Sequence, residues 1–370
     1  MGTFVPAEPF PPGEYLQDEL DGRNWTHEDL SAITGISRRQ IANIVKGSSG
    51  ITPDTAKAIG AAFGQDPVTW MNLQVAFELA SAAVEDREVE RRAKLFSKVP
   101  IREMQRRHWI PSDCSTDELE KEVCSFLEIP NITAQAVLSV AARKSDNYEI
   151  TNPAQLAWYF RVKQLAPAAP VSTKYRDSNW EPGVQELLKL AANPEDARLV
   201  PRVLCDMGIH FVLLQHVTKS KIDGVAMWLG KSPVVGLSLR HDRMDNFWFS
   251  LLHELIHIRH KHESPVDEEI GPRDDLPEIE QVANREAAAA LIPEKKLESF
   301  ILRCGPSFQQ SRVVQFARTV GVHPHIVAGQ LRHRGAIKYW QLTKLNAKIA
   351  SYIKGQAVTE GWGDTIALES

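Results

Sequence analysis

Cysteine is scarce in this chain, and its few cysteines form no motif. Four occur among 370 residues, far apart and without a CxxC pair: Cys114, Cys124, Cys205 and Cys304. This pattern excludes the disulfide-rich scaffold of small secreted domains and a zinc site built from paired cysteines. We expect free, mostly buried thiols in a reducing cytoplasm.

Long apolar runs are missing as well. No segment approaches the roughly 20 apolar residues that a membrane-spanning helix needs. The first 16 residues do not combine a basic start with an apolar stretch, as a secretory signal would. We therefore expect a cytoplasmic protein with no membrane partner. A strong positive charge is also absent: the formal net charge is −4, so no global basic field indicates nucleic acid.

Hydrophobic patterning predicts an α+β fold that is mainly α. With 43% hydrophobic residues, a chain of this length should form two or three globular domains. Most segments have helical spacing, whereas one region has short apolar runs between turn residues. We predict three strands over 209–214, 224–229 and 233–239, an apolar helix over 246–260 and an alanine-rich helix over 278–291.

The same patterns suggest where the domains begin and end. Short helices with tight turns come first, followed by charge-dense helical segments, then the strands and the apolar helix. We predict a helical bundle over 1–80, a helical connecting region over 81–190, a domain with a small sheet over 191–335 and a helical tail over 336–370.

The apolar helix contains a metal-binding pattern. Residues 253–257 read HELIH, which fits HExxH. His253 and His257 are four residues apart, so on a helix they share one face and can bind one zinc ion through nitrogen. Glu254 is adjacent and can reach a water on the metal as a general base without binding the metal. Such polar groups within an apolar segment would be costly unless they were used.

Zinc needs a third protein ligand, and the alanine-rich helix offers carboxylates. Glu280 shares a face with Asn284 and small alanines, whereas Glu286 lies on another face and Glu278 at the fraying start. We therefore predict Glu280 as the third ligand and Zn²⁺ as the cofactor. Manganese or iron would also accept these ligand types.

A metzincin arrangement does not fit the sequence. That pattern requires glycine and histidine at the seventh and tenth positions after the first histidine of the motif, where this chain has His260 and Glu263. A His–His–Glu site is therefore preferred. His260 and His262 are either solvated residues at the helix end, favoured there by the helix dipole, or contacts for a transition state or an adventitious metal.

These motifs resemble the ImmA/IrrE family of metallopeptidases. The resemblance covers roughly residues 190–300 and rests on HELIH and on E-x3-N-x8-P across Glu280, Asn284 and Pro293. It implies a gluzincin-like peptidase domain whose typical substrate is a helix-turn-helix repressor. The roles it implies are metal ligation by His253, His257 and Glu280, and general-base chemistry by Glu254.

Residues 26–47 predict two helices joined by a tight turn at Thr34-Gly35-Ile36. Thr26 and Asp29 suit a capping box at the start of the first helix. Ala32 would permit a close crossing of the helices. The apolar contacts expected between them come from Leu30, Ile33, Ile36, Ile41 and Ile44.

The second helix of this pair has the side chains of a DNA reader. Arginine binds guanine and asparagine binds adenine in the major groove, while hydroxyl and lysine groups hold phosphates. The predicted DNA contacts are Ser37, Arg38, Arg39, Gln40, Asn43 and Lys46. Residues 1–80 nevertheless hold ten acidic and five basic residues, so a module for dimer or partner contacts is the alternative.

Residues 8–80 also resemble HigA-type antitoxins of the Xre helix-turn-helix group. The resemblance is specific at GITPDTA (50–56) and WMNLQ (70–74). It implies a homodimer that binds operator DNA, represses its own operon and can bind a RelE-like toxin.

Two functions fit the whole sequence. In the first, the protein is a DNA-binding regulator with a zinc endopeptidase domain that cuts a repressor, an antitoxin or its own charged segment 81–108. In the second, it is a repressor or antitoxin whose peptidase-like domain senses or binds a partner without turnover. The intact HELIH, including Glu254, favours the first.

Overall fold

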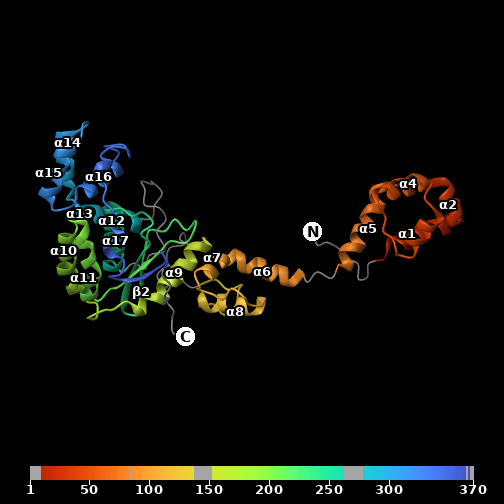
Figure 1. Ribbon diagram of the computed structural model, residues 1–370, viewed down its shortest axis with the longest axis horizontal. Helices are drawn as coiled ribbons and strands as arrows, with labels where there is room; N and C mark the ends of the chain where they lie inside the picture. Colours follow the sequence, from red (N-terminus) through yellow and green to blue (C-terminus); the bar gives the residue numbers. More distant parts are fainter. Residues whose placement is uncertain (1–9, 83–85, 137–151, 262–277, 364–365, 367–370) are drawn as a thin grey trace. The chain divides into compact units, whose positions relative to one another are not determined.

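The computed structural model describes residues 10–82, 86–136, 152–261, 278–363 and 366. It divides into two units, residues 1–87 and 88–370, each with its own contacts (Figure 1). The mainly helical α+β fold class is confirmed. Among the described residues, no helix is both long and apolar enough to cross a membrane. The four cysteines are free but only half-buried, so the expectation of mostly buried thiols was wrong.

The first unit is a bundle of short helices with well-formed ends. Thr26 and Asp29 form the expected capping box, and Ser37 and Thr52 cap the next two helices through their hydroxyl oxygens. A Cβ at Gly13 would lie 2.1 Å from the carbonyl oxygen of Ile44, so glycine is required where the first helix crosses the third. The helices are α1 (Pro12–Arg23), α2 (His27–Thr34), α3 (Arg38–Val45), α4 (Pro53–Phe63) and α5 (Pro67–Ser81).

The core of this unit partly differs from the sequence prediction. Leu30, Ile41 and Ile44 are buried as expected, and Ile36 packs against them. Ile33, however, is 51% exposed, and Ala32 is exposed as well. The prediction of their contacts was wrong because α2 meets α3 through one narrow stripe, and both residues fall outside it.

The second unit is built on a four-stranded sheet, in the order β2-β3-β1-β4. Three strands match the predicted ones: β1 (His210–Leu214), β2 (Gly224–Leu229) and β3 (Ser232–Leu237). β1 runs parallel to β3, with Phe211 opposite Val235, and β2 runs antiparallel to β3, with Ala226 opposite Val235.

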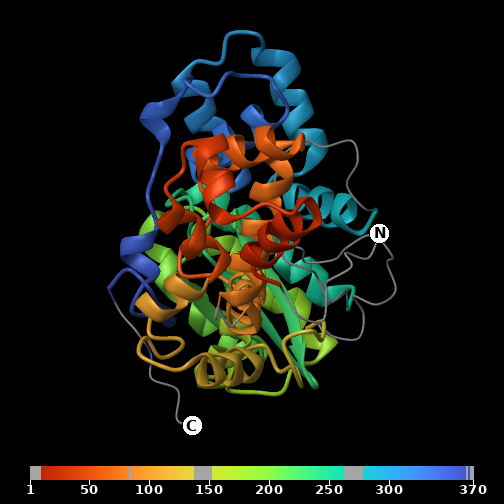
Figure 2. The ribbon, with the colours of Figure 1, turned by 90° about the vertical axis from the view of Figure 1, so that its right-hand side faces the viewer.

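Both faces of the sheet are covered by helices (Figures 1 and 2). Phe211 and Leu213 of β1 pack into one core, which the helices carrying HELIH and Glu280 share, while Val212 and Leu214 pack into a second core on the other face. This two-sided burial explains why the strands read as continuous apolar runs. The helices are α6 (Asp86–Lys98), α7 (Ile101–Arg106), α8 (Thr116–Phe126), α9 (Pro153–Leu165), α10 (Trp180–Leu190), α11 (Val200–Met207), α12 (Met244–Arg259), α13 (Glu278–Leu291), α14 (Glu294–Cys304), α15 (Gln310–Val320) and α16 (Pro324–His333).

The predicted connecting region is part of this unit. Residues from Glu88 onward belong to it, and α9 packs on the second face of the sheet with the helices before it. Trp158 of α9 donates a hydrogen bond from Nε1 to the carbonyl of Leu214 in β1. Residues 134–136 are not helical, and residues 137–151 and 262–277 lie outside the described residues.

The tail also differs from the predicted helical tail over 336–370. It contains a short 3-10 turn (Thr343–Leu345), α17 (Ala350–Ile353) and the strand β4 (Val358–Glu360), which pairs in parallel with β1. Glu360 is buried and receives hydrogen bonds from Arg161 of α9 and from the indole of Trp109. A three-residue strand is too short to show alternation, so its pairing partner decides its conformation.

Candidate metal centre

The part of the helix that carries HELIH, residues 250–258, is buried on every side. α12 packs against β2 and β3 on one side and against α13 and α16 on others. A helix that is apolar all round belongs in a core, which is why this segment is helical and enclosed. His253 and His257 lie one turn apart on it and are almost completely buried.

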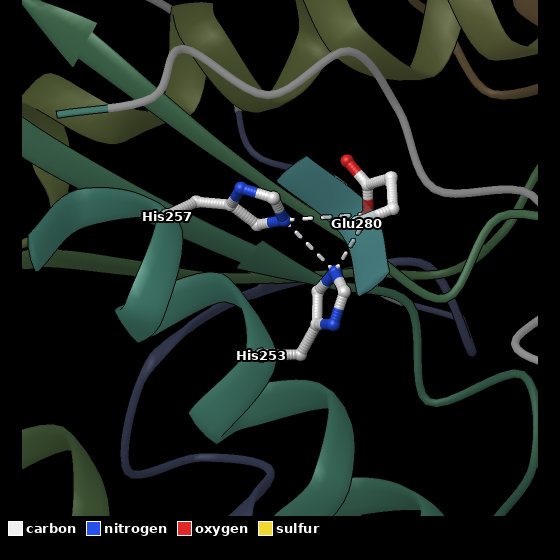
Figure 3. Close-up of side chains that lie close together, drawn as sticks. All are labelled: His253, His257 and Glu280. Atoms are coloured by element: carbon white, nitrogen blue, oxygen red, sulfur yellow. Dashed lines mark hydrogen bonds and ion pairs between the residues drawn. The ribbon is translucent and has the colours of Figure 1, made fainter. Parts of the chain in front are cut away.

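Three side chains of two helices converge at one point (Figure 3). His253 Nε2 lies 2.9 Å from His257 Nε2 and 3.1 Å from Glu280 Oε2. His257 Nε2 lies 3.4 Å from the same carboxylate oxygen. Ligands about 2.0–2.1 Å from a tetrahedral zinc ion lie about 3.3 Å from one another, so these spacings fit zinc.

The chemistry of the set agrees with its geometry. Burial alone would raise the pKa of Glu280, but hydrogen bonds with His253 and His257 outweigh it and hold that pKa well below its usual range. The group therefore offers a carboxylate and two imidazole nitrogens in one enclosed place, which is the donor set of a catalytic zinc site.

Glu254 lies beside this group and is 1% exposed. Its carboxylate lies against the start of β2, where a Cβ on Gly224 would come within 2.5 Å of Glu254 Oε1. Only glycine leaves room there for the carboxylate. Sequence reasoning missed Gly224, because no local pattern links a strand residue to a helix 30 positions later.

The other candidates near the motif lie elsewhere. His260 is exposed at the end of α12, and its Nε2 lies 3.0 Å from Glu286 Oε2 rather than at the three converging side chains. This contact agrees with the rejection of Glu286 as a ligand. Glu278 is exposed. His262 and Glu263 lie outside the described residues.

The predicted DNA contacts lie on or beside α3. Ser37, Arg38, Arg39, Gln40 and Lys46 are exposed. Ser37 Oγ accepts the backbone N–H of Gln40. Arg38 forms an exposed ion pair of 2.6 Å with Glu28 of α2, so its charge is partly compensated.

A second feature of α3 is a stripe of three side chains. Arg39, Asn43 and Lys46 follow the i, i+4, i+7 spacing, which places them on one side of the helix. Arg39 and Lys46 are exposed and Asn43 is half-buried. This stripe is the part of α3 best suited to a base edge and a phosphate.

Comparisons with known proteins match a family model in each of the two units. A helix-turn-helix family model matches residues 16–70, and an IrrE N-terminal-like domain model matches residues 206–328. The uncharacterized HTH-type transcriptional regulator YddM of Escherichia coli K12 is 30% identical over 71 residues, which are 19% of this chain and 76% of that protein. The chain belongs to the helix-turn-helix family. It is a DNA-binding helix-turn-helix regulator fused to an IrrE-like peptidase domain.

Other relatives match the helix-turn-helix unit of this regulator. Virulence-associated protein I of Dichelobacter nodosus is 36% identical over 72 residues, which are 19% of this chain and 67% of that protein. Among solved structures, an addiction module antidote protein of the HigA family from Coxiella burnetii is 33% identical, with a TM-score of 0.19, over 20% of this chain and 79% of its own. A putative antidote protein of a plasmid maintenance system from Nostoc punctiforme is 31% identical, with a TM-score of 0.21, over 24% of this chain and 96% of its own.

Both functional groups lie within the matched ranges. The IrrE-like match begins in α11 and ends in α16, so it includes the sheet, α12 and α13. The helix-turn-helix match includes α2 and α3 with every candidate DNA contact. The candidate metal centre and the candidate DNA contacts therefore belong to different units of the regulator.

Proposed function

We propose that this regulator is a zinc-dependent endopeptidase that cuts a repressor-type or antitoxin-type protein, or its own chain. The observation that carries the proposal is the convergence of His253, His257 and Glu280 within 3.4 Å, with Glu254 buried beside them. Three protein ligands leave the fourth tetrahedral position for water or substrate, which is the arrangement of catalytic zinc sites.

The residues have distinct parts in this reaction. A bound zinc ion would supply Lewis acidity, polarising the scissile carbonyl and lowering the pKa of a water toward 7. Glu254 accepts the proton of the attacking water and passes it to the leaving amine. Gly224 keeps the space in which that carboxylate lies, and the two buried helices hold the histidines and Glu280 in a fixed geometry.

The proposal is tested on the full chain with three single variants. Wild type and Glu254→Gln should each bind one zinc ion, whereas Glu280→Ala should lose it. Glu286→Gln is the matched control, because this acid lies on the same helix but contacts His260 instead. Metal content measured by mass spectrometry after dialysis separates these cases.

Cleavage is then followed on gels, with the chain alone and with candidate repressor and antitoxin proteins. Products should form with wild type and Glu286→Gln but not with Glu254→Gln. Zinc binding without cleavage of any candidate, together with operator binding, would instead favour the regulator whose peptidase-like domain has no turnover.

Self-cleavage within the charged segment 81–108 has a structural requirement. α6 and α7 occupy residues 86–98 and 101–106. A peptidase needs an extended backbone, so cutting within these helices requires local unwinding. Cleavage of a separate protein is the simpler form of the proposal.

For the first unit we propose a homodimer that binds operator DNA through α3 and that can bind a toxin. An unpartnered apolar stripe supports the dimer: Val68, Val75 and Leu79 of α5 are 59%, 45% and 72% exposed and share one side of the helix. A second copy would cover this stripe symmetrically. Leu79→Lys should convert the dimer to a monomer in sedimentation equilibrium, and a wild-type mass for this variant would contradict the assignment.

A further inference from the structure

A pocket of about 500 Å³ lies next to the metal centre, where α12, α13 and α16 meet the ends of β2 and β3. Three of its lining residues tie it to the metal site. Phe249 is one turn before His253, with ring centroids 6.1 Å apart. Ala288 lies two turns after Glu280 on α13, and Asp223 directly precedes the glycine that makes room for Glu254. A chain bound at the metal centre would therefore reach this pocket.

The lining of the pocket contains more positive than negative side chains. Four arginines face two carboxylates. Arg240 donates two hydrogen bonds to Asp223, at 3.1 and 3.2 Å. Arg243 likewise donates two to Asp245.

The other two arginines lack a close carboxylate of their own in the lining. Arg332 reaches only Asp245, at 4.0 Å, and that carboxylate already binds Arg243. Arg334 forms looser pairs of 3.3 and 3.9 Å with Glu294 and Glu298 of α14, which do not line the pocket. The pocket therefore carries positive charge that the carboxylates of the described residues do not fully neutralise.

Arg332 shows this most clearly. It is 6% exposed, and its Nη2 donates to the carbonyl oxygen of Gln341 and to Asn346 Oδ1. Its Nε is buried and has no hydrogen-bond partner among the described residues. Burying a guanidinium with an unsatisfied N–H donor costs free energy unless an anion accepts that hydrogen bond. The pocket that it lines is where such an anion can bind.

We propose that this arginine pocket binds a carboxylate of the peptide substrate, so that the IrrE-like domain selects substrates with an Asp or Glu side chain near the scissile bond. The inference deepens the proposed peptidase function and rests on it for the identity of the ligand. Guanidinium groups match the planar geometry of a carboxylate. Asp223 and Asp245 in the same lining would repel a dianion such as phosphate, which favours a monoanion. Phe249 and Tyr339 supply an apolar wall for the stem of the side chain.

The test measures binding and cleavage separately. Zinc-loaded, full-length Glu254→Gln is immobilised and offered random octapeptides in which each position in turn is fixed as Asp or as Asn. Retained peptides are counted by mass spectrometry. We expect about tenfold enrichment of Asp over Asn at one position, as a charge-assisted hydrogen bond would give.

Two pocket variants and one control identify the source of any enrichment. Arg334→Gln removes a partly exposed charge, and Arg332→Lys keeps the charge but removes the Nε donor. Each should reduce the Asp preference to about twofold or less. Arg318→Gln changes an exposed arginine of α15 outside the pocket and should leave the preference intact. Thermal melting of each variant establishes that it is folded.

Several results would overturn the proposal. These are equal retention of Asp and Asn peptides, an Asp preference that survives both pocket variants, or loss of all retention with 1 mM inorganic phosphate but not with 1 mM acetate. The peptidase proposal has a separate readout, because it fails if zinc-loaded wild type cleaves no library peptide. An Asp preference that depends on the pocket, without cleavage, would leave the carboxylate site standing and remove only the catalytic role.

Discussion

Replacing Gly224 by alanine tests the placement of Glu254 without touching a metal ligand. The added Cβ would lie 2.5 Å from Oε1 of Glu254, closer than real Cβ contacts, and 3.0 Å from its Cδ and Cγ, which is tighter than most. Because Glu254 is 1% exposed, its carboxylate cannot swing into solvent and must move within the core. A shift of about 1 Å in a catalytic group costs roughly 100-fold in rate. We therefore expect kcat to fall about 100-fold.

Zinc content should stay at the wild-type level in Gly224→Ala, since the two histidines and Glu280 are unchanged. Overpacking should also lower the free energy of unfolding by about 1–3 kcal/mol. Gly236→Ala is the matched control. Gly236 is a glycine of the neighbouring strand β3, and its added Cβ would meet Val162 at 2.7 Å rather than the catalytic group. It should lose similar stability and keep its kcat.

The assay uses a quenched fluorescent peptide chosen from the cleavage library, with metal content and urea unfolding measured on the same preparations. A zinc-loaded Gly224→Ala protein with wild-type kcat would refute the reasoning, because Glu254 could not then act as the base from its position in the structure. An equal loss of kcat in the Gly236→Ala control would show that sheet overpacking, not displacement of Glu254, is responsible.

Three further predictions concern other parts of the chain. Arg161→Met leaves the buried Glu360 without its ion-pair partner and should lower the free energy of unfolding by about 3–5 kcal/mol in urea titrations, whereas adding Glu360→Gln should recover part of that loss. Burial lowers the pKa of His325 to about 4, below its unfolded value near 6.5, so the unfolded state binds the extra proton. The contribution of His325 to the free energy of unfolding is therefore highest above pH 6.5 and decreases as the pH falls toward 4. Wild type should lose about 2 kcal/mol more than His325→Asn between pH 7 and 5. The DNA contacts are tested in a gel-shift assay with DNA from upstream of the protein's own coding sequence. Arg39→Ala should weaken binding by about 1–3 kcal/mol, and Arg38→Ala by less, because Arg38 already pairs with Glu28. Equal effects of the two variants would contradict the role assigned to the stripe on α3.

Much of the local structure could be predicted from the sequence. The strands, the HELIH helix and the alanine-rich helix lie within two residues of their predicted bounds. The capping box of Thr26 and Asp29 was also predicted. These features depend on residues a few positions apart, where spacing and propensity act directly.

Errors arose where distant segments meet. Ile33 was assigned to the core and is exposed, because the angle between helices selects which apolar residues are covered. The tail was predicted as a helix, but residues 358–360 form a strand with β1 because that strand has a free edge for them. Residues 81–190 were predicted as a helical connecting region, yet the helices from Glu88 onward cover one face of the sheet.

The sequence by itself determined that two histidines would lie on one face of a buried helix, because residues four positions apart on a helix lie about one turn apart on the same face. It also determined a helix pair with arginines at the start of its second member. Only the tertiary structure decided that Glu280 reaches those histidines, that Gly224 borders Glu254, and that two pairs of arginines from distant segments share one pocket. These proximities follow from how helices and strands pack, and packing depends on the surfaces of whole elements rather than on any local spacing.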